Sequence, residues 1–189
     1  MLESPRMRVV QSPVTADQLK PPAPQCRTVQ FFQVLSEPEH LLLAKFLRKH
    51  PHLELRVYGH SNSDVDFLRH YPEVRHLAVE AFELQCFDGL EHVSPELESL
   101  TLGQTRARGP SLKLLERFGK LRSLYLERHS KDIDAVGALS GLQELTLRSI
   151  TLADLSILLP LKGLLSLDFK LGGTTNLELL PKVGKLRYL

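Results

Sequence analysis

"LQELTLRSITLADLSILLPLKGLLSLDF", residues 142–169, contains leucines at two different spacings. A three-then-two spacing occurs at Leu142, Leu145 and Leu147 and again at Leu164, Leu167 and Phe169. Between them, Leu152, Leu155, Leu158 and Leu161 follow one another at intervals of three. The alternation of period two predicts a short strand with one apolar side. The spacing of three predicts a short 3₁₀ or helical return whose inner edge faces the same core.

The same pattern recurs along most of the chain. Its central residues are Leu77, Leu100, Leu124, Leu145, Leu167 and, in a partial copy, Leu189, at intervals of 21 to 24 residues. A degenerate copy centres on Leu55, where His52 replaces the first apolar residue. One strand and one return cannot bury their leucines alone, so neighbouring units must stack. A heptad coiled coil does not fit this interval or the prolines and glycines inside the units.

The repeat resembles the leucine-rich repeat family, in particular its 22-residue SDS22-like/bacterial class. The resemblance covers residues 53–189 and is clearest from Leu142 through Asp154 to Leu164. It implies an α/β solenoid with a parallel β-sheet on the concave face and short α or 3₁₀ returns on the convex face. It also implies a scaffold for binding, but it names no partner, because one fold serves many functions.

One loop position departs from the family. Five residues after each central leucine the family usually has Asn or Cys, whose side chain bonds loop backbone. This chain instead has His60, Phe82, Thr105, His129, Ile150 and Gly172. Buried backbone groups still need partners. We therefore expect backbone bonds between neighbouring loops, with Phe82 and Ile150 as core residues.

The chain divides at residue 28. Residues 1–27 contain five prolines and no period, which predicts a disordered or loosely packed N-terminal arm. Residues 28–189 form the repeat domain, in which 28–52 read as a strand and helix that cap repeats 53–189. We expect the strand at residues 29–35, a helix ended by Pro51, and another short helix capped by Ser63 or Asp64. The last repeat is incomplete, which suggests a fragment of a longer array or edge association through an uncapped C-terminal end.

The outward residues of the strands define a candidate binding face. Tyrosine and arginine are over-represented among residues that dominate binding energy. The candidate partner-binding residues are Arg56, Tyr58, His76, Glu80, Tyr125, Glu127, Arg148, Asp168 and Lys170. We expect the site to centre on Tyr125, Glu127 and Arg148.

Charge is segregated between two neighbouring repeats. Residues 73–98 contain seven acidic side chains and one basic side chain. Residues 104–131 contain eight basic side chains, one of them Arg108, and two acidic side chains. The first explanation is pairing between stacked coils, and the second is a basic patch for an acidic partner or RNA. The bases surround the coil instead of forming a stripe, so we expect no nucleic-acid partner.

The sequence carries no recognisable catalytic, cofactor or metal motif. The eight histidines and the two cysteines, Cys26 and Cys86, do not assemble a zinc tetrad by spacing. "LGGTT" at residues 171–175 lacks the lysine of a phosphate loop. We therefore predict no catalytic residues, no metal and no cofactor.

These patterns together predict a non-enzymatic module that binds a protein or peptide through its concave face. The alternative is the recognition domain of a larger, truncated effector or enzyme. A net charge of +2 and the lack of an apolar stretch long enough for a membrane span predict no membrane partner. No secretory signal is recognisable, so we expect a cytoplasmic protein, with a secreted effector as the alternative. The resemblance to the leucine-rich repeat class implies a bacterial origin.

Overall fold

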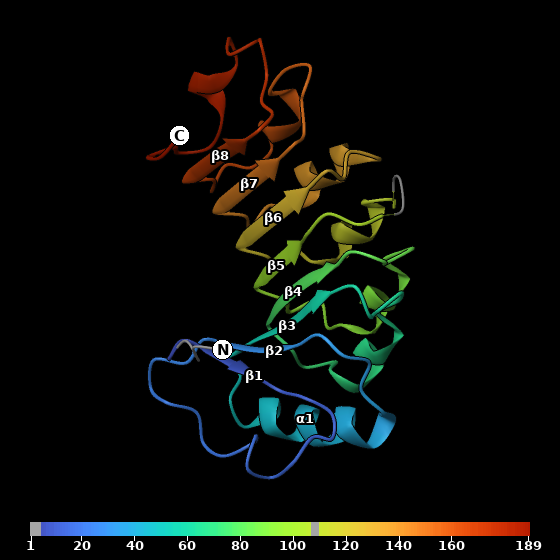
Figure 1. The fold of residues 1–189 in the computed structure, drawn as a ribbon. Helices are drawn as coiled ribbons and strands as arrows, with labels where there is room; N and C mark the ends of the chain where they lie inside the picture. Colours follow the sequence, from blue (N-terminus) through green and yellow to red (C-terminus); the bar gives the residue numbers. More distant parts are fainter. Residues whose placement is uncertain (1–4, 107–109) are drawn as a thin grey trace.

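In the described part of the chain, eight parallel strands form one open sheet in the order of the sequence (Figure 1). The computed structural model describes residues 5–106 and 110–189. The strands are β1 Met7–Val9, β2 Thr28–Phe31, β3 Glu54–Gly59, β4 His76–Ala81, β5 Ser99–Leu102, β6 Ser123–Glu127, β7 Glu144–Arg148 and β8 Ser166–Lys170. Each strand pairs with the strand of the next repeat. The predicted parallel sheet is therefore confirmed.

From β2 onward, short helices return the chain from each strand toward the next, on one side of the sheet (Figure 1). The first is the α-helix α1 Glu37–Arg48. The later returns are the 3₁₀ helices η1 Asp66–His70, η2 Asp88–His92, η3 Lys113–Arg117, η4 Ile133–Ala138, η5 Ser156–Leu158 and η6 Leu180–Lys182. A 3₁₀ turn repeats every three residues, so the leucine spacing of three matches these returns.

The core is a column of stacked leucines. The central residue of each repeat lies opposite its counterpart, from Leu55 and Leu77 through Leu145 to Leu167. A second column runs from Val57 to Leu147 two residues further along each strand. The central leucines of β3 to β8 are at most 1% exposed. The period-two pattern thus places these side chains in the core, as predicted.

The N-terminal segment packs against the sheet more than its sequence suggests. Residues Met7–Val9 pair in parallel with β2, a strand that the proline-rich composition did not predict. Val10, Val14 and Cys26 are buried. The Glu39 carboxylate accepts hydrogen bonds from the backbone N–H groups of Val14 (2.9 Å) and Ser36 (2.7 Å). The Ser36 hydroxyl also donates to this carboxylate at 2.6 Å, and this bond, followed by the backbone bonds, lowers the pKa of Glu39 to about 2. The Val14 bond ties the segment to the start of α1.

The cap elements follow the prediction with local differences. β2 ends at Phe31 and not at residue 35, and α1 ends at Arg48, three residues before Pro51. The predicted cap at Ser63 or Asp64 was wrong, since Val65 precedes η1 and makes no side-chain cap. Asp64 Oδ1 instead accepts the N–H of Asp66 at 3.2 Å, which shapes the turn into η1.

The loop position that lacks the family's polar residue is bridged by backbone bonds. The Ile150 carbonyl accepts the Gly173 N–H at 3.0 Å, and the Leu152 N–H donates to the Gly173 carbonyl at 2.8 Å. In an earlier pair of loops the Phe82 N–H donates to the Gly59 carbonyl at 2.8 Å. The expected loop-to-loop bonds are therefore confirmed. Ile150 is a core residue, but Phe82 is only half-buried, so its assignment to the core was wrong.

Replacing Ile150 with asparagine is expected to lower the stability. The side chain is 2% exposed, and the neighbouring backbone groups already have partners. A buried amide without a partner costs about 1–3 kcal/mol. Thermal unfolding followed by circular dichroism should show a lower melting temperature for Ile150→Asn, with Ile150→Val as the control for lost volume. A rise in melting temperature would show that the loop accepts the family's polar residue after all.

Candidate functional site

Polar side chains cover the sheet face opposite the returns, which we call the open sheet face. Alternation along each strand points every second residue away from the leucine core. In the middle row, Tyr125 lies opposite Thr101 on one side and Thr146 on the other. In the row beyond it, Glu127 lies opposite Arg148, and Arg148 opposite Lys170. The parallel register therefore aligns residues of successive repeats into common rows.

Tyr125, Glu127 and Arg148 form one connected group on this face. The Arg148 guanidinium Nε lies 3.1 Å from Glu127 Oε1, and the Tyr125 hydroxyl donates to Glu127 Oε2 at 3.4 Å. Burial and the Glu127 charge raise the pKa of Tyr125, so the phenol keeps its proton. The Arg148 side chain is 42% exposed and the Glu127 side chain 21%. The group thus offers an arginine, a carboxylate and an aromatic ring that remain within reach of a partner.

A second group occupies the N-terminal strands. The Arg56 guanidinium pairs with the Glu80 carboxylate and also donates to Gln30 Oε1 at 2.9 Å. Its central carbon lies 4.8 Å from the centre of the Tyr58 ring, in cation–π geometry. Tyr58 is 48% exposed, which is a large apolar area for a free surface. Three of the predicted residues, Arg56, Tyr58 and Glu80, therefore meet here.

The remaining predicted residues stand apart from these groups. Lys170 Nζ lies 3.0 Å from Asp168 Oδ2 at the end of β8. His76 is half-buried at the start of β4, and burial is the main cause that lowers its pKa. The structure thus places all nine predicted residues on or at the end of strands of the open sheet face, but it divides them into separate groups.

Small residues separate the two groups. Ala78, Thr101 and Gly103 lie between the Arg56 and Tyr125 strands. A Cβ atom on Gly103 would lie 2.9 Å from Glu80 Cγ, so a side chain there would displace the Glu80 carboxylate. The open sheet face therefore has a low centre between two charged groups.

His129 fixes the backbone of Gly103 at this centre, a role that the sequence did not predict. It is 2% exposed, and its Nε2 lies 2.8 Å from the Gly103 carbonyl, to which it donates. Its ring packs edge-on against Phe87 at 4.9 Å. Burial lowers the pKa of His129, which favours the neutral ring. The signal in the sequence was its place at the family's loop position, where a polar side chain usually bonds backbone.

The acidic and basic coils pair only sparsely among the described residues. Arg106 Nη1 lies 3.1 Å from Glu83 Oε2, and Arg117 donates to the Glu91 carbonyl. Arg75 pairs with Glu98 inside the acidic coil at 2.8 Å. Arg108, which belongs to the predicted basic set, lies outside the described residues. Pairing between the two coils therefore involves only a few of their charged side chains, and a role for the remaining basic residues stays a prediction.

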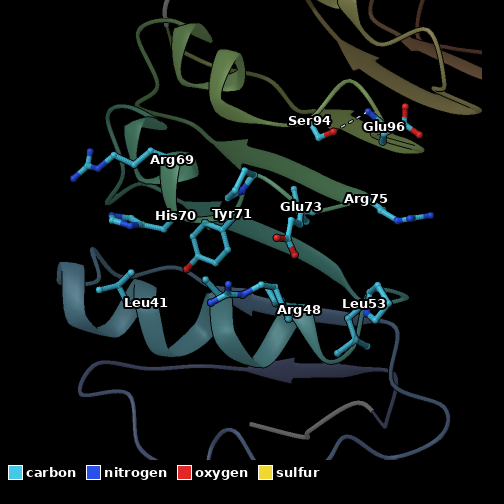
Figure 2. Close-up of a pocket in the computed structure, with 15 residues that line it drawn as sticks. Leu41, Arg48, Leu53, Arg69, His70, Tyr71, Glu73, Arg75, Ser94 and Glu96 are labelled. Atoms are coloured by element: carbon cyan, nitrogen blue, oxygen red, sulfur yellow. Dashed lines mark hydrogen bonds between the residues drawn. The ribbon is translucent and has the colours of Figure 1, made fainter.

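A pocket of about 620 Å³ lies away from this face, between α1 and the segment that follows η1 (Figure 2). Its lining includes the apolar side chains of Leu47, Leu53 and Val74, with Tyr71 in the middle. The Tyr71 hydroxyl lies 2.8 Å from His40 Nδ1, and burial raises the pKa of that hydroxyl. The ring is therefore fixed by α1, and its polar end is already bonded.

Within residues 5–106 and 110–189, no group of three His, Cys, Asp or Glu side chains is placed to hold a metal ion. The helices in those ranges are all too short or too polar to cross a membrane. At the C-terminal end Tyr188 pairs with Ser166 of β8. Association through that edge stays a prediction.

Solved structures with the same fold give the comparison with known proteins. No protein-family model and no curated protein matches the sequence. Internalin F and internalin C2 from Listeria monocytogenes match with TM-scores of 0.61 and 0.62 at 17% and 15% identity. The matches cover 87% and 86% of this chain, and 47% and 69% of the internalins. A leucine-rich repeat protein from Leptospira interrogans matches with a TM-score of 0.54 at 13% identity, over 87% of this chain and 48% of that chain.

The chain therefore has the leucine-rich repeat fold. It spans about half the length of internalin F and of the Leptospira protein. A TLR13 chain crystallised with single-stranded RNA shares the fold at a TM-score of 0.51 and 14% identity, over 93% of this chain and 33% of that chain. At such identities the likeness shows architecture and not a ligand. Membership of the 22-residue class and a bacterial origin stay predictions.

Proposed function

We propose that this chain is a binding module that captures a protein partner on the open sheet face, centred on Tyr125, Glu127 and Arg148. The observation that carries the proposal is the connected group itself. An arginine, a carboxylate and a tyrosine from two adjacent strands are held in one arrangement and remain partly exposed. Such side chains dominate binding energy when a partner covers them.

The rest of the face supports a protein more than a small molecule. The Arg56 group and the Tyr125 group flank a low centre of small residues. Strands of a solenoid are rigid, so a partner docks with little cost of ordering. The side chains are oriented by ion pairs before binding, which favours specific contact over a broad area. We propose binding, and not catalysis, as the role of these residues.

Charge reversal tests this proposal. Glu127→Arg and Arg148→Glu should each weaken binding of a partner isolated with the wild-type chain by at least about tenfold, which corresponds to about 1.4 kcal/mol. The double variant Glu127→Arg/Arg148→Glu restores an internal ion pair with reversed polarity. It should fold as the wild type does while binding stays weak, because the partner meets the wrong sign at each position.

The matched control lies on a return. Glu116→Arg makes the same change of charge at an exposed position of η3, away from the open sheet face. It should leave the affinity unchanged in isothermal titration calorimetry. Wild-type affinity in both single reversals, with circular dichroism unchanged, would move the site off this face. Binding that is lost equally in Glu116→Arg would indicate an effect of net charge alone.

A further inference from the structure

A second pocket, of about 390 Å³, opens beside the first turn of α1. It lies between the link from β2 to α1, the loop after β3, and η1. We call it the acidic pocket, and its defining residues are Val34, Glu37, Asn62, Asp64, Asp66 and His70. Figure 2, drawn on the neighbouring pocket, shows Arg69 and His70 extending to the same side of η1, away from Glu73 and Arg75.

Two buried polar atoms at this pocket have no partner in the described structure. Asn62 is 6% exposed, and its amide nitrogen Nδ2 makes no hydrogen bond. The Nε2 atom of His70 is likewise buried and unbonded. Leaving such groups unsatisfied destabilises a protein, and they are rare in native structures. A ligand or water that supplies an acceptor to Asn62 recovers that free energy.

The rim of the pocket is negatively charged. Glu37, Asp64 and Asp66 are exposed, and none of them forms an ion pair within residues 5–106 and 110–189. Asp64 accepts the N–H of Asp66 with one oxygen, and its other oxygen accepts no hydrogen bond from the part of the chain that the structure describes. Arg69 also lines the pocket and donates to the Asp66 carbonyl at 3.4 Å. The carboxylates therefore outnumber the single arginine, and the pocket favours a cation.

Apolar and aromatic groups form the remaining walls. The Phe67 ring stacks on His40 at 4.9 Å with an interplanar angle of 1°, and His40 stacks on His70 at 5.9 Å. Val34 is 64% exposed at the entrance. A methylene stem of a long basic side chain gains contact with such walls while its charged end reaches the carboxylates. A metal ion fits less well, because an amide nitrogen and an arginine offer it no ligand.

We propose that the acidic pocket binds the side chain of an arginine or lysine of an extended peptide. The carboxylates of Glu37, Asp64 and Asp66 receive the cationic end. After a rotation of its side chain toward the pocket, Asn62 donates to the main-chain carbonyl of the same residue. This site lies beyond the ends of β2 and β3 and shares no residue with the group of Tyr125, Glu127 and Arg148, so it does not depend on that proposal.

Three small ligands separate the contributions. N-acetyl-arginine methylamide carries both the cation and the carbonyl, its citrulline counterpart keeps the shape without the charge, and n-butylguanidine keeps the single charge without the carbonyl. Chemical-shift titration of the ¹⁵N-labelled chain should show binding of the arginine compound at the loop of residues 61–66. The citrulline compound and n-butylguanidine should each bind at least about tenfold more weakly, since each lacks one of the two contacts. Equal binding of the citrulline compound would overturn the charge contact, and equal binding of n-butylguanidine would overturn the role of Asn62.

Variants test the same residues from the protein side. Asn62→Leu should lose binding while the free protein melts at the same or a higher temperature, because the unpaired amide is removed. Glu37→Gln/Asp66→Asn removes two charges and leaves the Asp64 turn intact, so it should also bind at least about tenfold more weakly. Glu116→Gln/Asp134→Asn makes the same change at exposed positions on η3 and η4 and should bind normally. Wild-type binding in Asn62→Leu, or in the Glu37→Gln/Asp66→Asn variant, would overturn the proposal.

Discussion

Replacing Leu145 with alanine is expected to destabilise the protein by about 2–5 kcal/mol. The side chain is 1% exposed and lies in the leucine column, between Leu124 of β6 and Leu167 of β8. Parallel strands on both sides hold the backbone in register, so the cavity left by alanine cannot collapse. Such a loss is a large part of the 5–15 kcal/mol that holds a typical domain together. Urea unfolding followed by far-ultraviolet circular dichroism measures it.

The neighbouring residue supplies the control for Leu145. Glu144 belongs to the same strand, is exposed, and points to the opposite face. Glu144→Ala should change the free energy of unfolding by no more than about 0.5 kcal/mol, as usual for a surface position. A cost below about 1 kcal/mol for Leu145→Ala would contradict the assignment of the core, since a fully buried leucine cannot be removed so cheaply.

Acid is expected to weaken the fold through His40. Burial, with a smaller contribution from nearby His70, lowers the pKa of His40 from 6.5 to about 4. The unfolded chain therefore takes up the proton first, and stability is fully present above pH 6.5 and falls as the pH drops from 6.5 toward 4. One pKa unit corresponds to about 1.4 kcal/mol, so this histidine alone removes about 3 kcal/mol by pH 4. Urea unfolding at several pH values between 7 and 4 measures the slope.

A variant without the imidazole isolates this contribution. His40→Phe keeps the ring stacked on Phe67 but leaves the Tyr71 hydroxyl unpaired, so Tyr71→Phe is added to remove that hydroxyl. The double variant should lose about 3 kcal/mol less than the wild type between pH 7 and pH 4. Glu39 starts to lose its contribution as the pH falls through its ordinary pKa of 4.5, but it is present in both proteins, so its effect cancels in the comparison. Identical slopes for both proteins would show that His40 does not titrate with unfolding.

The repeat could be recognised in the sequence because local backbone geometry sets the spacing of its buried residues. A strand exposes every second residue to the core, and a 3₁₀ return exposes every third, so both leave a period in the sequence. Leu145 and Leu167 could be placed in one column from their spacing alone. The same alternation identified the outward residues, and Tyr125 and Arg148 are among those that the structure brings into contact with Glu127.

Other features had no local cause and escaped prediction. The strand β1 forms from three residues that follow a proline-containing terminus, and each of them pairs with a β2 residue 21 positions further along the chain. Its existence depends on an available sheet edge. The bond from His129 to Gly103 crosses 26 residues of sequence, and no spacing rule links that pair.

The sequence by itself determined the fold and the face on which the polar residues lie, because burial of leucines at fixed periods permits one stacking of repeats. The tertiary structure alone decided how those polar residues group, since ion pairs such as Glu127 with Arg148 depend on the register between strands. It also created the acidic pocket, where Asn62 and Glu37 approach from different repeats. Side-chain partners and cavities arise from packing between segments, and packing of that kind leaves no period in the chain.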